Sequence, residues 1–188
     1  VDQHRGASWA ARRRMVVVAN QAALHQRLGR YADALALYGT LQSSAVPLPS
    51  GEHGQVMVNE GALFRRLGDP YKALAAYDRA GADFAQAHDA IGEVTVLTNR
   101  GIALALDLDR IDDALASFTA AARAASAANS PREELLARLY RGETLLRSNR
   151  ADAARADFAA ALAAAVALDT REEQWKALFD IDIMGAVR

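Results

Sequence analysis

The chain lacks several features on which whole functional classes depend. It has no cysteine, which excludes a disulfide framework, a thiolate zinc site and a cysteine nucleophile. Its longest uninterrupted apolar run, Phe158–Leu168, is much shorter than the roughly 20 residues of a membrane-spanning helix. The formal net charge is only -1, so composition gives no general reason to expect nucleic acid or a membrane as a partner. The lack of cysteine is compatible with the cytoplasmic location that we expect.

Motifs for catalysis and for cofactors are also missing. The sequence has no phosphate-binding loop, nucleophile elbow or paired-carboxylate motif. None of its four histidines has a second histidine or a carboxylate at a recognised metal-binding spacing. We therefore expect a chain that is not an enzyme and that has no catalytic residue, no metal and no cofactor.

What the sequence does contain is an internal repeat of about 40 residues. Three columns keep this period: a small residue, an alanine, and an aromatic residue four positions after the alanine. The members of the columns are Ala22, Gly61, Gly101 and Gly142; Ala34, Ala73, Ala114 and Ala154; and Tyr38, Tyr77, Phe118 and Phe158. Because independent columns share one period, the similarity between the repeats is not explained by a chance likeness of alanine-rich segments.

Each repeat is predicted to form two helices. A break separates them at Gly29, Gly68, Asp109 and Asn149, and glycine and asparagine tolerate the left-handed conformation that ends a helix. Ser130 followed by Pro131 and Glu133 has the pattern of a helix start with a serine cap. The expected helices span residues 8–28, 31–43, 52–67, 70–87, 91–107, 111–128, 131–147, 151–168 and 171–187, with one irregular loop, Ser44–Gly51.

The repeated small residues predict close packing within each pair of helices. A glycine inside a helix costs up to about 1 kcal/mol relative to alanine, so repeated ones indicate that a side chain would hold the two helices apart. The aromatic residue of the third column is then expected to fill the gap toward the next repeat. Such pairs cannot bury their apolar faces alone, so we expect an all-α, right-handed α-solenoid with a concave side.

We expect a single array over residues 1–188. Its repeats span about 8–50, 51–89, 90–129 and 130–169, and a terminal helix spans 170–187. Because the sequence begins and ends within a helical pattern, we also expect it to be part of a longer protein.

These columns resemble the tetratricopeptide repeat (TPR). The second repeat carries the resemblance best, with Met57, Asn59, Gly61, Phe64, Gly68, Asp69, Tyr71, Ala73, Tyr77 and Ala80. The period is near 40 rather than the usual 34, as in the long-period subgroup of kinesin light chains and bacterial signalling proteins. The stretch from Asn99 to Phe118, together with Glu172–Trp175, is also similar to repeats that precede caspase-like CHAT protease domains in bacteria.

The resemblance implies that the first helix of each repeat lines a concave, partner-binding face. Asn20, Asn59 and Asn99 occupy one repeated position on that helix. An asparagine amide both donates and accepts hydrogen bonds, so a ladder of amides can hold a peptide backbone whatever its side chains are. The alternative is that each asparagine ties helices together or faces water.

Two cationic positions are further candidates for the peptide groove. Arg65 and its neighbour Arg66 can meet a carboxylate, although such pairs more often form a solvated face. Arg100 belongs to a polar column with Gln21, Glu60 and Arg141. This column either lines the groove or forms ion pairs between adjacent repeats, such as Glu60 with Arg100.

The sequence therefore favours a non-enzymatic protein-interaction module that binds a peptide or partner protein on its concave face. One alternative is the regulatory or recognition arm of a larger bacterial signalling protease, whose catalytic domain would be an adjacent domain of the same parent chain. Another is a self-assembly scaffold, because an uncovered terminal helix at 170–187 would expose apolar surface and promote a weak homodimer.

Overall fold

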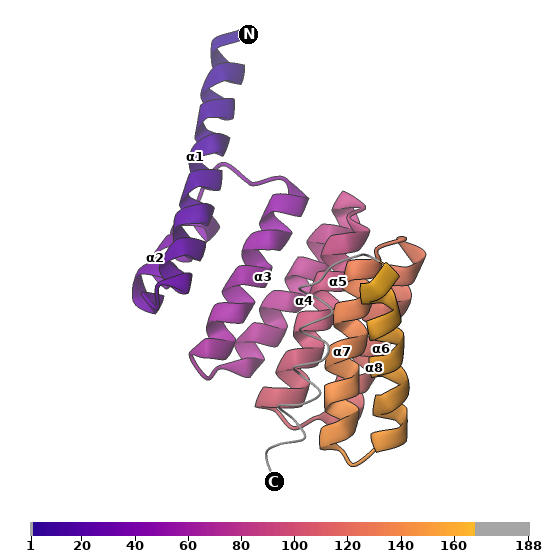
Figure 1. Cartoon of the computed structure of the whole chain (residues 1–188). Helices are drawn as coiled ribbons and strands as arrows, with labels where there is room; N and C mark the ends of the chain where they lie inside the picture. Colours follow the sequence, from indigo (N-terminus) through magenta and orange to yellow (C-terminus); the bar gives the residue numbers. More distant parts are fainter. Residues whose placement is uncertain (1, 168–188) are drawn as a thin grey trace. The chain divides into compact units, whose positions relative to one another are not determined.

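The structure of the chain, a computed structural model, describes residues 2–167, with side chains from Trp9 to Val166. Within this range every regular element is helical, the two helices of each pair (α1 with α2, α3 with α4, α5 with α6, α7 with α8) run side by side, and most connections are short turns (Figure 1). The elements are α1 (Asp2–Arg27), α2 (Tyr31–Gln42), α3 (Ser50–Arg66), α4 (Pro70–Ala87), α5 (Ala90–Ile102), η1 (Ala103–Asp107), α6 (Ile111–Ala127), α7 (Pro131–Arg147) and α8 (Ala151–Ala167). The predicted all-helical repeat architecture is confirmed. The helix expected at 171–187 lies outside the described residues.

The chain divides into two compact units, Val1–Asp89 and Ala90–Arg188. In the first, α1 packs against α2 and α3 against α4, while α3 also contacts α1 and α2. In the second, α5 packs against α6, α6 against α7 and α7 against α8, and α5 also contacts α7. Each unit thus contains two of the expected helix pairs. The single array of four repeats stays a prediction.

The two helices within each pair are separated where the sequence predicts. Gly29 and Gly68 have φ angles of 74° and 78°, and Asp109 and Asn149 have 52° and 61°. These angles lie in the left-handed region, which glycine enters without penalty and which asparagine and aspartate tolerate better than other residues. The same kind of residue therefore ends the first helix of every pair.

The helix starts differ in how they are capped. The Asp69 side chain accepts a hydrogen bond from the backbone N–H of Lys72 at 3.1 Å, directly before Pro70 at the first position of α4. The serine cap expected at Ser130 is not formed, because its hydroxyl makes no capping bond. The Ser130 hydroxyl instead donates to the carboxylate of Glu133, so Glu133 takes the hydroxyl that would otherwise cap the backbone.

Residues of the glycine column and of the aromatic column pack against each other within a helix pair. Tyr38, Tyr77 and Phe118 are almost completely buried. A methyl group added at Gly101 would lie 2.5 Å from the Phe118 ring. The ring therefore occupies the space that glycine leaves within its own helix pair, and the expectation that it only fills the gap toward the next repeat was incomplete. Phe118 does reach the next repeat as well, since its ring stacks on that of Tyr140 with centroids 6.0 Å apart.

We expect the same substitution to have opposite effects at two helical glycines. Gly39→Ala in α2 should raise the free energy of unfolding by about 0.5–1 kcal/mol, because an added methyl group meets nothing within 4 Å. Gly101→Ala should lower it, because overpacking of about 1–3 kcal/mol outweighs the better helix propensity. Urea denaturation of both variants measures the two changes, and two changes of equal sign would contradict the packing role of Gly101.

The first helix of the third repeat ends in a π-helical turn, where an α-helix was expected. The expected helix 91–107 is α-helical only to Ile102 and continues as η1, after which the N–H of Arg110 bonds to the carbonyl of Leu104 at 2.8 Å. Gly101 and Ala114 are 13 positions apart (114 − 101), whereas Gly61 and Ala73 are 12 apart (73 − 61). A π turn holds one more residue than an α turn, so η1 accommodates the extra residue of the third repeat.

Candidate functional site

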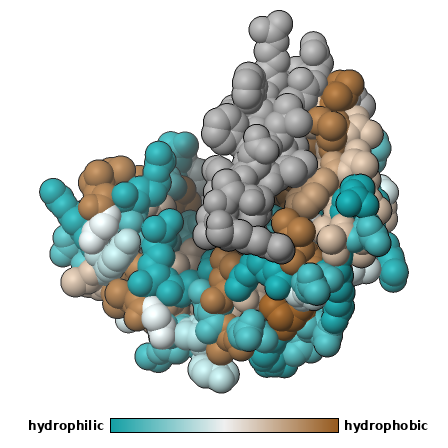
Figure 2. All heavy atoms as spheres, turned by 60° about the horizontal axis from the view of Figure 1, so that its bottom comes forward, coloured by the Kyte–Doolittle hydropathy of each residue, from teal (hydrophilic) through white to brown (hydrophobic). Residues whose placement is uncertain are grey.

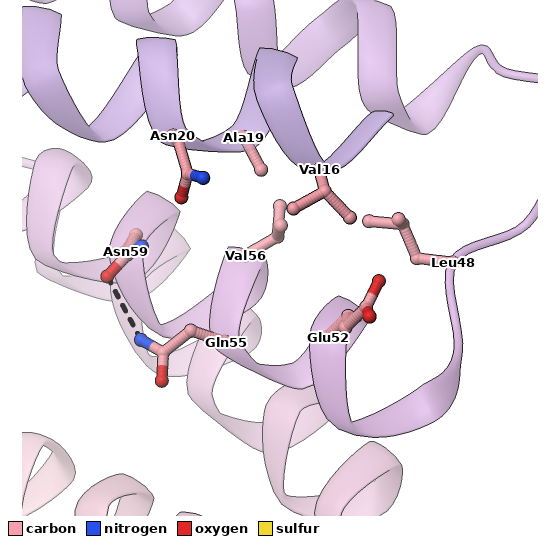
Figure 3. Close-up of a pocket in the computed structure, with 8 residues that line it drawn as sticks. All are labelled: Val16, Ala19, Asn20, Leu48, Glu52, Gln55, Val56 and Asn59. Atoms are coloured by element: carbon pink, nitrogen blue, oxygen red, sulfur yellow. Dashed lines mark hydrogen bonds between the residues drawn. The ribbon is translucent and has the colours of Figure 1, made fainter. Parts of the chain in front are cut away.

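The first helices of the two repeats in the first unit enclose a small pocket. Its volume is about 120 Å³, and it lies between α1, α3 and the loop that precedes α3 (Figure 3). Val16, Leu48 and Val56 point toward one another at one end, and Asn20 and Asn59 face each other at the other (Figure 3). The structure thus brings two of the three predicted ladder asparagines to one site.

The third ladder asparagine lines a corresponding pocket in the second unit. This pocket, of about 270 Å³, lies between α5 and α7. Asn99 and Thr95 contribute from α5, and Leu136 and Tyr140 from α7. Tyr140 stands at the position that asparagine holds in the other repeats.

The two pockets are built from the same positions of the repeat. Six positions are shared: Val16, Ala19, Asn20, Glu52, Gln55 and Asn59 in the first unit correspond to Thr95, Thr98, Asn99, Glu133, Leu136 and Tyr140 in the second. The offset is 79 residues along the first wall (99 − 20) and 81 along the second (140 − 59). An asparagine on one wall and a glutamate on the other are therefore common to both units.

The asparagine side chains keep part of their hydrogen-bonding capacity for a ligand. The Asn59 carbonyl accepts a hydrogen bond from the Gln55 amide at 3.2 Å, and the Asn99 amide donates one to the backbone carbonyl of Thr95 at 2.9 Å. Both contacts lie within a single helix, whereas an asparagine amide has two donor hydrogens and an acceptor oxygen. Asn20 is exposed, and Asn59 and Asn99 are half-buried. The observed contacts leave the Asn59 amide group and the Asn99 carbonyl available at the pocket wall.

The two predicted arginines lie elsewhere. Arg65 and Arg100 are half-buried, and neither is among the residues that line the two pockets. Each already has an interaction partner in the structure. Their contribution to a binding groove stays a prediction.

The glutamates of the two pockets were not identified as site residues from the sequence. Glu52 and Glu133 each lie in the first turn of a first helix, α3 and α7. The signal was visible as an acidic residue that recurs near the start of successive repeats, but helix capping is a sufficient explanation for such a residue. Only the packing of two first helices shows that this position faces the asparagine column.

Glu60, in the polar column next to the asparagines, joins two repeats. Its side chain is buried, and both carboxylate oxygens accept hydrogen bonds from the Gln42 amide of α2, at 2.9 and 2.8 Å. Burial raises the pKa of Glu60 above its ordinary value, against the opposing effects of the Gln42 hydrogen bond and of the charges of Arg79 and His53. Glu60 therefore links the first repeat to the second, and it is not among the residues that line the pocket.

We expect Glu60 to make stability depend on pH. Because its pKa is higher in the folded state than in the unfolded chain, the folded state binds more protons between the two values, and stability falls as pH rises through that window. The window begins near the ordinary value of 4.5 and extends upward. Urea denaturation from pH 4 to pH 8 should show that Glu60→Gln loses less stability across this range than the unmodified chain. Parallel pH profiles for the two proteins would contradict the assignment.

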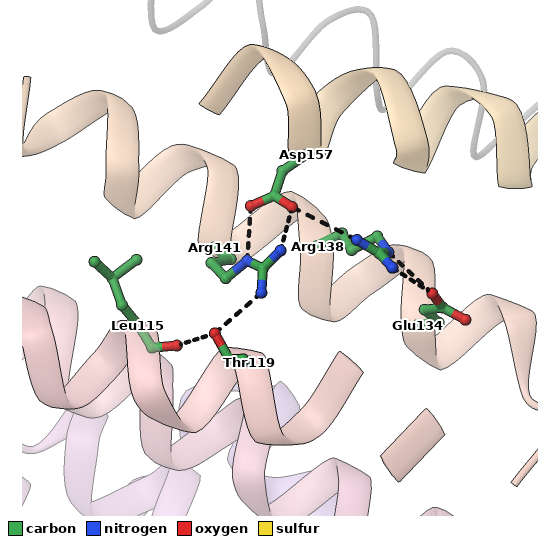
Figure 4. A network of polar contacts seen from close by, with 6 residues as sticks. All are labelled: Leu115, Thr119, Glu134, Arg138, Arg141 and Asp157. Atoms are coloured by element: carbon green, nitrogen blue, oxygen red, sulfur yellow. Dashed lines mark hydrogen bonds and ion pairs between the residues drawn. The ribbon is translucent and has the colours of Figure 1, made fainter. Parts of the chain in front are cut away.

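The same column forms a charged network in the second unit. Arg141 of α7 donates to both carboxylate oxygens of Asp157 in α8 and also to the hydroxyl of Thr119 in α6, at 3.0 Å (Figure 4). Arg138 bridges Glu134 at 2.8 Å and Asp157 at 3.7 Å (Figure 4). The hydrogen bonds to Asp157 raise the pKa of Arg141 further. The contacts of this column between repeats are hydrogen bonds, from Gln42 to Glu60 and from Arg141 to Thr119. The expected ion pairs between adjacent repeats are not what these two residues form, because the ion pair of Arg141 with Asp157 lies within the fourth repeat.

The surface outside the pockets carries both hydrophobic and hydrophilic residues. On the face in Figure 2, hydrophobic residues lie between hydrophilic ones, and the large exposed apolar side chains include Trp9 and Val17. No helix within residues 2–167 combines the length and apolar content needed to cross a membrane. In the same range no group of three or more acidic or histidine side chains is arranged to hold a metal ion.

Comparison with known proteins identifies the fold. No family model and no curated protein matches the chain. The crystal structure of BtubC (BKLC) from P. vanneervenii is similar, with a TM-score of 0.64 and 14% sequence identity, over 100% of this chain and 89% of that one. The structure of MamA AMB-1 is similar with a TM-score of 0.53 and 20% identity, over 93% of this chain and 99% of that one. At these identities the likeness concerns the fold, and the chain has the all-helical repeat fold of TPR-like solenoid proteins.

Proposed function

We propose that the chain is a non-enzymatic protein-interaction module that binds an extended segment of a partner protein between the first helices of its repeats. The observation that carries the proposal is the recurrence of one pocket, built from the same six positions, in both units. Packing alone does not require polar side chains at these positions, because in three of the four helix pairs the first helix packs against the aromatic ring of its partner through a glycine, Gly61, Gly101 or Gly142.

The chemistry of the pockets suits a peptide backbone. An extended peptide presents an N–H and a C=O at every residue, and the amides of Asn20, Asn59 and Asn99 can pair with both. Small apolar surfaces beside the amides, such as Val16 and Val56, accommodate side chains. This mode of binding fixes the main chain and leaves sequence preference to the pocket walls.

The two other functions expected from the sequence make different use of the same surface. As the recognition arm of a larger protease, the chain would bind a substrate or regulator in these pockets and pass the signal to an adjacent domain. As a self-assembly scaffold, it would associate through the predicted helix at 170–187, which lies outside the described residues. Neither has a specific observation in its favour, and we propose the interaction module without them.

The proposal predicts that alanine at the ladder positions weakens peptide binding without unfolding the chain. Each hydrogen bond contributes about 0.5–1.5 kcal/mol, so Asn59→Ala and Asn99→Ala should each lower affinity roughly 2- to 10-fold. The measurement is retention of blocked ten-residue peptides of randomised sequence on an array, followed by titration of the strongest. Thermal midpoints should hardly change, since alanine favours the helix.

The matched control is Gln86→Ala, which removes an exposed amide from α4, outside both pockets. It should retain the full binding of the unmodified chain. Equal binding by all three variants would contradict the proposal, and so would an array on which the unmodified chain retains no peptide. Loss of folding in Asn59→Ala and Asn99→Ala would instead assign the ladder a structural role.

A further inference from the structure

A third, larger pocket lies beside the N-terminal part of α1. This helix is longer than its partner α2 and extends past it at its N-terminal end (Figure 1). The pocket has a volume of about 590 Å³, and its wall includes Trp9, Arg12, Arg13, Val16, Pro49 and Glu52. Trp9, Arg12 and Arg13 are not part of the predicted asparagine ladder.

The pocket is aromatic and carries an excess of positive charge. Trp9 is 61% exposed, and the Arg13 guanidinium lies over its ring at 4.7 Å from the centroid. In the part of the chain that the structure describes, neither Arg12 nor Arg13 makes an ion pair with a carboxylate, and Glu52 is the one acidic side chain on the wall. Two guanidinium groups against one carboxylate favour a ligand that brings a negative charge.

This pocket is continuous with the pocket of the asparagine ladder. Val16 and Glu52 line both. Along α1, Arg12 precedes Val16 by four residues, which is about 6 Å of helix, and Asn20 follows after another 6 Å or so. Two residues of an extended peptide cover about 6.6 Å, and side chains two apart point to the same side. The spacing therefore matches a peptide that presents every second side chain to the groove.

We propose that the face formed by α1 and α3 binds an extended peptide in which an acidic residue and an aliphatic residue are separated by one residue. The carboxylate meets Arg12 and Arg13 beside Trp9, the aliphatic side chain enters the pocket between Val16, Leu48 and Val56, and the following backbone reaches the ladder asparagines. A volume of about 120 Å³ suits a single aliphatic side chain, since a cavity of about 150 Å³ holds a benzene molecule. This inference rests on the proposed function and assigns it a ligand class.

A peptide fits this face better than a polyanion does. Nucleic acids are bound by rows of cations, because each phosphate that is neutralised adds to the affinity. Here the two arginines are followed along the groove by Glu52 and by apolar side chains. Glu52 would repel further phosphates, and the apolar side chains would not bind them. One negative charge followed by an apolar group is the complementary pattern.

The test is an NMR titration of the ¹⁵N-labelled chain with three blocked five-residue peptides. The first is glutamate–serine–leucine–serine–serine; the second replaces the glutamate by lysine, and the third replaces the leucine by serine. The affinity of each peptide is obtained from the shifts of the backbone amide signals of α1 and α3. The first peptide should bind about fivefold or more tightly than either of the other two. In the variant Arg12→Glu/Arg13→Glu the glutamate peptide should lose its advantage over the lysine peptide.

A control variant has the same change in net charge at exposed arginines outside the pocket, Arg123→Glu/Arg155→Glu. It should keep the preference of the unmodified chain. If the glutamate peptide binds no more tightly than the lysine peptide, or no more tightly than the peptide without leucine, this inference is overturned. The proposed function then still holds, provided that the binding of array peptides depends on Asn59. If no peptide binds in either experiment, both fall. Tighter binding of a mixed-sequence single-stranded DNA by the same arginines would also overturn the inference.

Discussion

Phe118→Ala is expected to lower the free energy of unfolding by about 3–5 kcal/mol, the usual cost of removing a buried phenylalanine ring. The ring is 1% exposed, covers Gly101 in its own helix pair and stacks on Tyr140 of the next one. Its loss should therefore open a cavity that no neighbouring side chain can fill, because glycine has none. Urea denaturation followed by far-UV circular dichroism measures the change.

The control for this substitution is an aromatic residue that stands in solvent. Tyr71 is 70% exposed, and Tyr71→Ala should change stability by about 0.5 kcal/mol or less. A loss below about 1 kcal/mol for Phe118→Ala would contradict the role of the glycine–aromatic contact as the main packing device of the repeat.

Asp157→Ala is expected to cost about 3 kcal/mol, near the low end of the range for breaking a buried ion pair. The substitution removes the carboxylate that is bound by Arg141 and approached by Arg138, and it leaves the Arg141 side chain, only 22% exposed, without a carboxylate partner. The low end applies because the guanidinium retains some contact with water. Thermal and urea denaturation both measure the effect.

Asp152→Ala in the same helix is the matched control. Asp152 also forms an ion pair, with Arg155 at 2.8 Å, but both side chains are largely exposed. Exposed pairs contribute about 0–1 kcal/mol, so this variant should be nearly as stable as the unmodified chain. Equal losses for Asp152→Ala and Asp157→Ala would show that burial does not distinguish the two pairs.

The fold follows from the sequence where local chemistry decides it. The breaks at Gly29, Gly68 and Asn149 were predictable because few other residues tolerate the left-handed conformation found there. The glycine–aromatic contact was partly predictable, since repeated helical glycines indicate close packing, but the direction of the ring depends on tertiary geometry. The π turn at η1 had a sequence signal, because Gly101 and Ala114 are 13 residues apart instead of 12. A period averaged over the repeats does not show this difference.

The candidate site was predictable to a smaller extent. The columns of the repeat place Asn59 and Asn99 on equivalent faces of first helices, and each of them lines a pocket. The opposite wall, with Glu52 and Glu133, is set by how two repeats pack, which one repeat considered alone does not show. The pocket at Trp9 depends in addition on the length of α1, which starts at Asp2 rather than near residue 8.

The most direct test of the central claim is the response of the asparagine side chains themselves to a bound peptide. The side-chain amide signals of Asn20, Asn59 and Asn99 would be assigned by NMR and followed while the strongest array peptide is added to saturation. Binding at the pockets predicts that the signals of Asn59 or Asn99 shift and gain cross-relaxation with the peptide main chain, while the Gln86 signals stay unchanged. A peptide that binds fully and leaves all three asparagine signals in place would contradict the account.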